Sequence, residues 1–303
     1  MRFVVRCHQG GWTWQQLAAV WREADQLGYD GASLYDLLDT GLECWTALTA
    51  LVATTRLVGI PLVLANPYRP PAVVAKMAAT LDALSGGRVI LGLGSGGAPA
   101  DAARYGVAWP PAARRAAALE DAVRAMRLLW QGGGIFAGEG VRLAGASGAP
   151  PPATPGGPLV LIGGHGRRYL LRAAARVGDL CNIGIDLEET DWLAYRSLLD
   201  GYCREVGRDP ASLGLTHNAT VLLGHDESDY QRKLSAWAAR RSIPVEEAAA
   251  RLRTALAGTP DMVSERIARL KALGISWVFL IFQDLPDVAM MRLFAEQVLP
   301  RVR

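Results

Sequence analysis

Short apolar runs and longer amphipathic segments alternate along the whole chain. Apolar residues spaced three or four apart indicate helices, whereas short continuous apolar runs bounded by glycine or polar residues indicate buried strands. Helical patterns separate the apolar runs, and the first of them opens with Thr13 and Gln16 in the arrangement of a capping box. The pattern predicts eight strands, at 3–7, 31–35, 57–65, 89–93, 159–162, 179–183, 213–223 and 278–282.

Two stretches interrupt this alternation. Residues 132–158 hold five prolines and nine glycines, which rule out a regular helix, so we expect an excursion packed over the barrel rim. Residues 225–258 form a helical insertion with two successive helical patterns, at 227–241 and 245–256.

The strands and helices together predict an α/β fold. Several strands are continuously apolar, which is typical of a parallel sheet covered by helices on its outer face. The strand count and length favour a (β/α)8 TIM barrel with insertions after strands four and seven, forming one domain over residues 1–303. A doubly wound open sheet is the alternative, but it usually carries a glycine fingerprint after strand one, and Cys7-His8-Gln9-Gly10-Gly11 lacks that spacing.

Composition and charge narrow the class of protein. Half of the residues are apolar, 20% are charged and the net charge is only +3, as in an ordinary globular enzyme. No Lys/Arg cluster alternates with aromatic residues and no apolar run reaches membrane-spanning length, so we expect no nucleic-acid or membrane partner and a cytoplasmic location. The four cysteines and four histidines are scattered, so we expect neither a metal site nor a disulfide framework.

The stretch from 159 to 184 carries the strongest single signal for a ligand. The apolar strand at 159–162 ends in Gly163-Gly164-His165-Gly166, and a helix is expected to begin at once with Arg167 and Arg168. Glycines let backbone amides approach a ligand closely, and a helix N-terminus adds partial positive charge. The pattern indicates a phosphate site, with a tight turn and two solvated arginines as the alternative.

The residues at the strand ends predict the character of the ligand. In a (β/α)8 barrel the site lies at the C-terminal strand ends and in the loops that follow. The groups there suit a flat organic ligand with a phosphate tail better than a sugar phosphate, since Asp36 is the only carboxylate and no lysine is present. The strand ends are Cys7-His8, Tyr35-Asp36, Ala65-Asn66, Ser95-Gly96, Gly164-His165, Asn182 and Phe282-Gln283.

Several motifs follow one another in an order that covers nearly the whole chain. They are Ala83-Leu84-Ser85-Gly86-Gly87-Arg88, Gly92-Leu93-Gly94-Ser95-Gly96, Ile162-Gly163-Gly164-His165-Gly166 and Gly258-Thr259-Pro260. Together they resemble the luciferase-like monooxygenase superfamily. A second set resembles the deazaflavin branch of that superfamily, which uses coenzyme F-420: Tyr68-Arg69-Pro70-Pro71, Ala75-Lys76-Met77 and Leu81-Asp82.

The resemblance implies a barrel that binds FMN or coenzyme F-420 at the strand C-termini. The flat ring would lie against strands two to four, and the phosphate would sit at the Gly163-Gly164 loop. A non-prolyl cis peptide bond is also implied under the ring, between Leu62 and Val63. The expected cofactor-binding residues are Asp36, Leu62, Val63, Asn66, Gly94, Ser95, Gly163, Gly164, His165, Gly166 and Arg167.

Two departures from the family pattern affect the catalytic residues. Deazaflavin enzymes of this superfamily often carry Asp-His after strand two, where this chain has Asp36-Leu37, and many carry Glu after the strand-four glycines, where it has Gly97. The cofactor carries the hydride chemistry, but a proton must then come from another group. His8 is the best-placed imidazole, and Asp36 could orient the ring or a water. A rim histidine and a turn-capping carboxylate are the respective alternatives.

The substrate would lie among the 97–110 loop, the 132–158 insertion and the segment after strand seven. These segments hold few assignable polar groups, so a largely apolar small molecule, such as a secondary metabolite, is expected. The expected substrate contacts are Cys7, Trp109, Asn182 and Phe282.

The leading function predicted is hydride transfer between coenzyme F-420 and this organic substrate. An FMN-dependent monooxygenase and a non-catalytic cofactor-binding relative are the alternatives. Members of the superfamily are often dimers, so a homodimer is expected.

Overall fold

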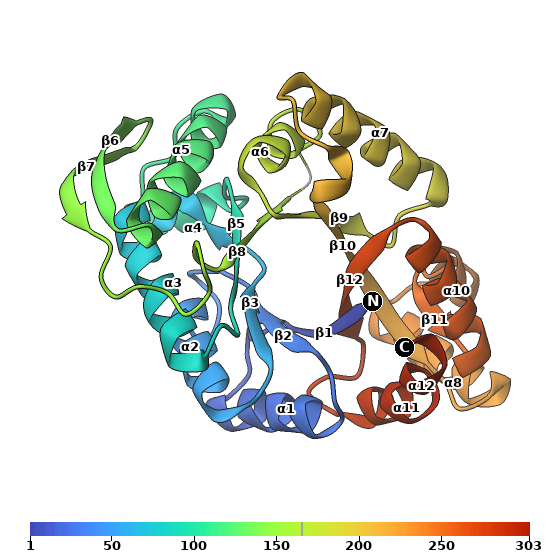
Figure 1. Cartoon of the computed structure of the whole chain (residues 1–303). Coiled ribbons are helices and arrows are strands. Elements are labelled where there is room, and N and C mark those ends of the chain that lie inside the picture. The colour runs from blue at the N-terminus through green and yellow to red at the C-terminus, as the bar shows by residue number, and fades with distance from the viewer. Residues whose placement is uncertain (165) are drawn as a thin grey trace.

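The computed structural model describes residues 1–164 and 166–303, and its centre is a barrel of parallel strands (Figure 1). Its strands are β1 (Arg2–Cys7), β2 (Gly31–Leu34), β3 (Val58–Pro61), β4 (Leu64–Ala65), β5 (Ile90–Gly94), β8 (Leu159–Gly163), β9 (Leu180–Ile185), β10 (Gly214–Leu223) and β12 (Ile275–Phe282). Their order is β3-β2-β1-β12-β10-β9-β8-β5-β4, and a parallel bridge between Gly59 and Val89 joins β3 to the residue before β5. The sheet therefore closes on itself, which confirms the predicted (β/α)8 barrel.

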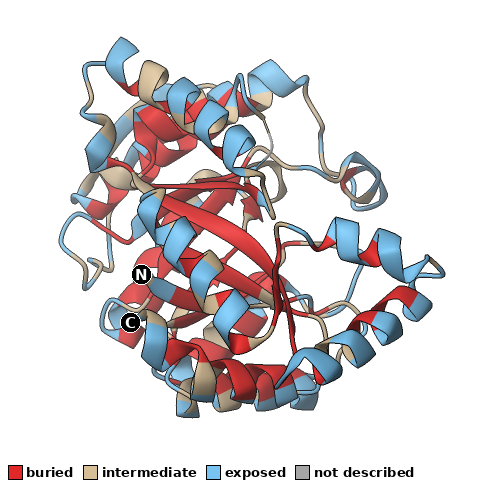
Figure 2. Ribbon diagram, turned by 90° about the vertical axis from the view of Figure 1, so that its right-hand side faces the viewer, coloured by how far each residue is buried: buried red, intermediate tan, exposed pale blue. Residues whose placement is uncertain are grey.

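Helices surround the barrel (Figure 1), and Figure 2 shows their outward faces exposed and the strands buried beneath them. The first helix has the predicted capping box: Gln16 N donates to Thr13 Oγ1 at 3.2 Å, and Thr13 N donates to Gln16 Oε1 at 2.9 Å. The helices are α1 (Trp14–Gln26), α2 (Cys44–Thr54), α3 (Pro71–Ser85), α4 (Pro99–Arg104), α5 (Ala112–Trp130), α6 (Leu170–Val177), α7 (Glu189–Glu205), α8 (Glu227–Arg240), α9 (Val245–Arg251), α10 (Pro260–Ala272), α11 (Ala289–Gln297) and α12 (Leu299–Val302), with 3-10 turns η1 (Asn66–Tyr68) and η2 (Pro210–Ser212).

The third predicted strand, 57–65, is divided in two. A cis peptide bond between Leu62 and Val63 separates β3 from β4, at the position that the resemblance implied. Both halves keep parallel partners, because β3 pairs with β2 and β4 pairs with β5. The division places Val63 at the C-terminal end of the barrel, where it enters the site described below.

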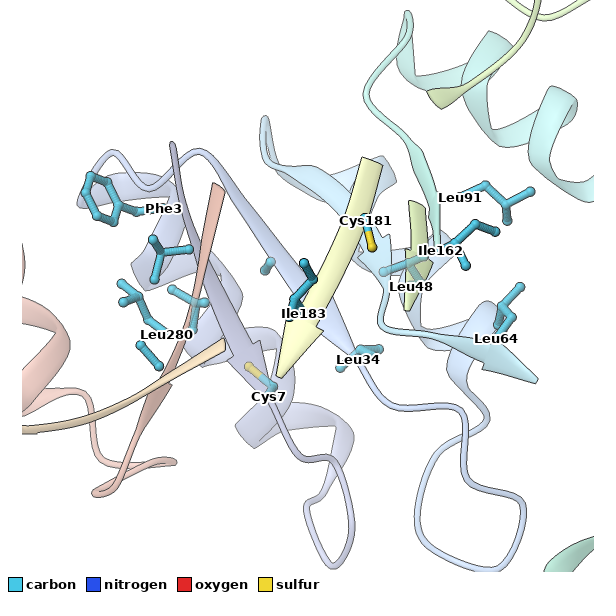
Figure 3. Close-up of a cluster of buried hydrophobic side chains, with 14 of the residues drawn as sticks. Phe3, Cys7, Leu34, Leu48, Leu64, Leu91, Ile162, Cys181, Ile183 and Leu280 are labelled. Atoms are coloured by element: carbon cyan, nitrogen blue, oxygen red, sulfur yellow. The ribbon is translucent and has the colours of Figure 1, made fainter. Parts of the chain in front are cut away.

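Strand side chains alternate between two separate apolar clusters. One cluster fills the barrel interior and includes Val4, Ile60, Leu161 and Phe279. The larger cluster lies between the strands and the outer helices, and part of it is drawn in Figure 3, where Phe3 and Cys7 belong to it. Since successive residues of a strand face opposite sides of the sheet, this alternation decides which strand-end residues reach the interior.

The two insertions lie in different places. Residues 132–158 contain an antiparallel hairpin of β6 (Gly133–Gly138) and β7 (Val141–Ser147), which lies at the periphery beside α5 (Figure 1). This corrects the expected packing over the barrel rim, because the hairpin packs against α5 and α3 in the outer layer. After β10 the insertion forms α8, α9 and a short strand, β11 (Leu256–Gly258), that pairs with β10.

All four cysteine thiols are buried, and this gives a first prediction. Burial raises the pKa of Cys7 and of Cys181 to about 12, and it also raises the pKa values of Cys44 and Cys203. Because the thiolate is the reactive form, the folded protein is expected to react very slowly with dithionitrobenzoate at mildly alkaline pH. Spectrophotometric titration should then count four thiols per chain after unfolding in guanidinium chloride. A thiol that reacts within minutes in the folded protein would contradict this burial.

Candidate functional site

A cavity of about 680 Å³ opens at the C-terminal ends of the barrel strands. Most of its wall is apolar or glycine, and its polar groups come from β1, β9 and β10 and from the segments that follow β2, β4, β5 and β8. Its lining residues are Arg6, Tyr35, Asp36, Leu37, Leu62, Val63, Ala65, Tyr68, Gly94, Ser95, Gly96, Gly97, Ala98, Ala112, Gly163, Gly164, Gly166, Tyr169, Leu170, Asn182, Gly184, Ile185 and Asn218.

Val63 is bordered by glycines on the two neighbouring strands. A Cβ at Gly94 would lie 2.7 Å from Val63 Cγ2, and a Cβ at Gly163 would lie 2.8 Å from Val63 Cγ1. Deeper in the barrel, a Cβ at Gly92 would lie 2.0 Å from the Pro61 carbonyl oxygen. The three glycines thus leave the space that the divided third strand and the Val63 side chain occupy. The result is a small apolar platform in the cavity wall.

The glycine loop after β8 lies next to this platform. Gly163, Gly164 and Gly166 line the cavity, and Gly164 has a φ of +147°, which favours glycine. His165 lies outside the described residues. The expected helix start at Arg167 is corrected, because 167–169 form a turn and α6 begins at Leu170.

Arg167 does not line the cavity. Its guanidinium stacks on the Tyr195 ring at 4.5 Å and lies 3.7 Å from Asp191, on the outside of the barrel. The anion-binding groups that the described loop offers are therefore the backbone amides of its glycines.

Asp36 lies at the cavity wall in a bidentate ion pair. Its carboxylate oxygens accept from Arg69 Nη1 and Nη2, each at 2.8 Å, and one of them also accepts from the Ala65 backbone N–H at 2.8 Å. Burial lowers the pKa of Arg69, but the hydrogen bonds and charges of Asp36 and Glu43 outweigh burial and raise it overall. Asp36 thus fastens η1 and the end of β4 to β2, which is a positioning role.

Replacement of Asp36 by asparagine tests this positioning role. Loss of the pair would leave Arg69 with only 15% of its side chain exposed and without its main partner, so the free energy of unfolding should fall by about 3 kcal/mol. Asp39→Asn is the matched control, because Asp39 pairs with Arg104 at the exposed surface, where such pairs contribute about 0–1 kcal/mol. Urea denaturation measures both. Equal losses in the two variants would contradict the proposed role of Asp36.

Two further candidates lie beside the cavity. His8 is exposed, and its ring contacts the Tyr35 ring with centroids 4.8 Å apart. Asn66 begins η1, and the cavity is lined by its neighbours Ala65 and Tyr68. Neither His8 nor Asn66 is among the lining residues. No contact in the cavity therefore supports the predicted proton transfer by His8 or the predicted contact of Asn66 with the ring.

Gly94 and Ser95 form the cavity wall at the end of β5, and Trp109 supports this wall. Gly94 and Ser95 line the cavity, and the Ser95 carbonyl accepts from Arg115 Nε at 3.0 Å. Trp109 covers the outer side of this turn: a Cβ at Gly96 would lie 2.5 Å from its ring, and the Arg115 guanidinium stacks on it at 4.5 Å. Trp109 is therefore a support for the wall and is not itself a lining residue.

Only one of the four residues expected to contact the substrate lines the cavity. Asn182 lines the cavity, whereas Cys7 and Phe282 face the outer cluster. Phe282 packs edge-on against Phe294 of α11 with ring centroids 5.8 Å apart. Neither the 132–158 insertion nor the segment after β10 contributes a lining residue, contrary to expectation.

The alternation of the strands brings in residues that sequence reasoning missed. At the end of β1 the residue that lines the cavity is Arg6, and not Cys7 as expected. Asn218 lines the cavity from the middle of β10. His217, next to it, faces outward: it lies against Trp192 of α7, its Nδ1 is 2.7 Å from the Ile183 carbonyl oxygen, and burial lowers its pKa. The sequence held one signal for Arg6: it is a polar residue between two apolar residues, Val5 and Cys7, in strand one.

The described residues show no group of three or more His, Cys, Asp or Glu side chains placed to hold a metal ion. None of the described helices combines the length and apolar character needed to cross a membrane.

Sequence comparison finds relatives along most of the chain. The model of the luciferase-like monooxygenase family matches residues 2–276. The F-420-dependent glucose-6-phosphate dehydrogenase of Beutenbergia cavernae is 28% identical, over 92% of this chain and 91% of that protein. The phthiodiolone/phenolphthiodiolone dimycocerosates ketoreductase of Mycobacterium sp. strain JLS is 32% identical over 69% of this chain, and this match spans about half (55%) of that relative's length.

Solved structures share the whole fold. The coenzyme F-420-dependent tetrahydromethanopterin reductase of Methanopyrus kandleri has a TM-score of 0.82 at 18% identity, over 100% of this chain and 99% of that one. The oxygenating constituent of 3,6-diketocamphane monooxygenase of Pseudomonas putida, in complex with FMN, has a TM-score of 0.77 at 16% identity, over 100% and 99%. At these identities the likeness shows a common fold alone.

Proposed function

This chain belongs to the luciferase-like monooxygenase family, and we propose that it is an oxidoreductase that transfers a hydride between coenzyme F-420 and a largely apolar organic substrate. The observation that carries the proposal is the pairing of the Val63 platform with the Gly163-Gly164 loop on one side of the cavity. An apolar platform suits the face of a flat ring, and glycine amides suit a phosphate.

The residues present fit such a group sterically. Gly94 and Gly163 have no side chain that would displace Val63, and Gly164 exposes its backbone to the cavity. When bound, the deazaflavin ring supplies the hydride chemistry. The protein would hold the ring against Val63 and the phosphate at the glycine loop, with Ala65 kept in place by the Asp36–Arg69 pair.

The walls of the cavity would exclude water from the reacting centre. Leu37, Ala98, Ala112 and Ile185 are among its apolar lining residues. Among the described lining residues there is no imidazole, and both oxygens of the one carboxylate, Asp36, are engaged by Arg69. Of the groups that the described part of the chain offers, a proton that accompanies the hydride would therefore pass to or from one of the lining tyrosines, and otherwise to or from the substrate or water.

Coenzyme F-420 is favoured over FMN by the breadth of the sequence match. The F-420-dependent dehydrogenase from Beutenbergia cavernae aligns with 92% of this chain. An FMN-dependent monooxygenase is the second candidate, because an FMN enzyme shares this fold and both cofactors combine a flat tricyclic ring with a phosphate.

Fluorescence titration of the purified protein with coenzyme F-420 and, separately, with FMN tests the proposal. We expect a dissociation constant in the micromolar range for coenzyme F-420 and binding at least tenfold weaker for FMN. Preference for FMN would favour the monooxygenase, and binding of neither would remove the proposal. The expected homodimer stays a prediction, which light scattering in solution would test.

A further inference from the structure

The cavity has a second side that the cofactor proposal does not use. Val63 lies between β3 and β4 next to glycines of β5 and β8, and the glycine loop follows β8, whereas Arg6 and Asn218 come from β1 and β10. In the sheet, β12 lies between β1 and β10, and the β1–β12–β10 group is separated from β8 by β9. Two polar groups thus face the part of the cavity that remains for a substrate.

Arg6 is a cation without a carboxylate partner among the described residues. Its guanidinium stacks on the Tyr35 ring at 4.3 Å, and its Nε is buried without a hydrogen-bond partner. Burial lowers the pKa of Arg6, as expected for a charge that no carboxylate balances. Arg69, which lies near the same cavity, shows the contrast, because Asp36 and Glu43 neutralise it. An acidic group on a ligand would supply the partner that Arg6 lacks.

Asn218 also has a buried polar atom without a hydrogen-bond partner, in this case an acceptor. The residue is only 6% exposed, and its Nδ2 donates to Asn182 Oδ1 at 2.8 Å and to the Gly184 carbonyl at 2.6 Å. Asn182 Nδ2 in turn donates to Thr216 Oγ1 at 2.8 Å. This network fixes the direction of the amide and leaves Asn218 Oδ1 buried without a partner. A buried acceptor of this kind is costly unless a hydrogen-bond donor reaches it.

The register of the strands separates the two groups. Val4 and Asn218 both pair with Phe279 of β12, so Asn218 is in register with Val4, two strands away, and not with Arg6. Arg6 lies two residues closer to the cavity mouth than Val4. One molecule that reaches both groups must carry its acidic group and its donor group several bonds apart.

We propose that Arg6 and Asn218 recognise the substrate as an organic acid with an apolar body and a hydroxyl or N–H donor several bonds from the acidic group. The inference rests on the proposed function, because that proposal assigns the side of the cavity that the cofactor occupies. The proposed substrate is still largely apolar, as the sequence predicts. The inference adds to its apolar body one acidic group and one hydrogen-bond donor.

Calorimetry with three matched probes tests the inference. The probes are 4-(4-hydroxyphenyl)butanoate, its amide, which lacks the charge, and 4-phenylbutanoate, which lacks the hydroxyl. We expect the hydroxylated acid to bind at least tenfold tighter than the amide and at least threefold tighter than 4-phenylbutanoate. Arg6→Met should abolish the first preference, and Asn218→Ala should abolish the second. Arg2→Met is the control, because Arg2 lies on the same strand at the opposite end of the barrel, stacked on Trp277 at 4.9 Å; it should keep both preferences.

Cofactor titration of the same variants separates this inference from the proposed function. A lost preference for the acid with unchanged cofactor affinity would support the inference. Equal binding of acid and amide by the unaltered protein would overturn it, and this result does not depend on any variant folding. Loss of cofactor affinity in Arg6→Met would also overturn it, because Arg6 would then belong to the cofactor site. Calorimetry does not require bound cofactor, so the probe preference can be measured even if neither coenzyme F-420 nor FMN binds.

Discussion

Replacement of Gly92 by alanine is expected to lower the free energy of unfolding by about 3 kcal/mol. Gly92 lies in β5 with its missing side chain directed at the division of the third strand. An added Cβ would lie 2.0 Å from the Pro61 carbonyl oxygen and 3.3 Å from Val63 Cγ1. The nearest atom belongs to the backbone of a buried strand, so the clash can be relieved only by moving β3 away from β5. That movement would also disturb the Val63 platform.

Gly97→Ala is the matched control for this experiment. Gly97 lies a few residues further along the chain, is exposed, and has no heavy atom within 4 Å of the position of an added Cβ. Its replacement should change stability by no more than about 0.5 kcal/mol. Guanidinium denaturation followed by circular dichroism measures both variants. If Gly92→Ala were as stable as Gly97→Ala, the close approach of β5 to the third strand would be contradicted.

Replacement of Gly164 by alanine is expected to weaken cofactor binding by about 10- to 100-fold. Gly164 has a φ of +147°, a conformation that residues with a side chain rarely adopt, and an added Cβ would lie 2.2 Å from Leu170 Cδ1. Relief of this strain would turn the loop and displace the amides that we propose to hold the phosphate. Hydrogen bonds to a charged group contribute about 1.5–3 kcal/mol each, which sets the size of the effect.

Gly156→Ala separates the binding effect from a general effect on stability. Gly156 has a φ of +80°, so alanine is strained there too, but no heavy atom lies within 4 Å of an added Cβ and the residue does not line the cavity. Both variants should lose stability, because alanine is strained at both positions, whereas only Gly164→Ala should lose affinity in the fluorescence titration. Unchanged affinity in Gly164→Ala would place the phosphate elsewhere.

Much of the fold follows from local patterns in the sequence. The alternation of apolar runs with helical patterns predicts the eight barrel strands, because each element must bury its own apolar face against a neighbour. The capping box at Thr13 depends on residues close together in the chain, and it occurs as predicted. The motifs along the chain resemble a family, and this resemblance implied the cis peptide bond that lies between Leu62 and Val63.

The candidate site required the tertiary structure at three points. The sequence indicates that strands one and eight end near Cys7 and Phe282, but a difference of one residue reverses the direction of a side chain, so Arg6 reaches the cavity and Cys7 does not. Asp36 is visible in the sequence as a strand-end carboxylate, yet its pairing with Arg69 joins residues 33 positions apart.

The 132–158 stretch is the third point, because its composition excludes a helix but does not say which surface its hairpin covers. The sequence by itself thus determined the order of the eight barrel strands and the glycine loop, which depend on neighbouring residues. The tertiary structure alone decided which side chains meet in the cavity, because this depends on the facing and register of strands that are distant in the chain.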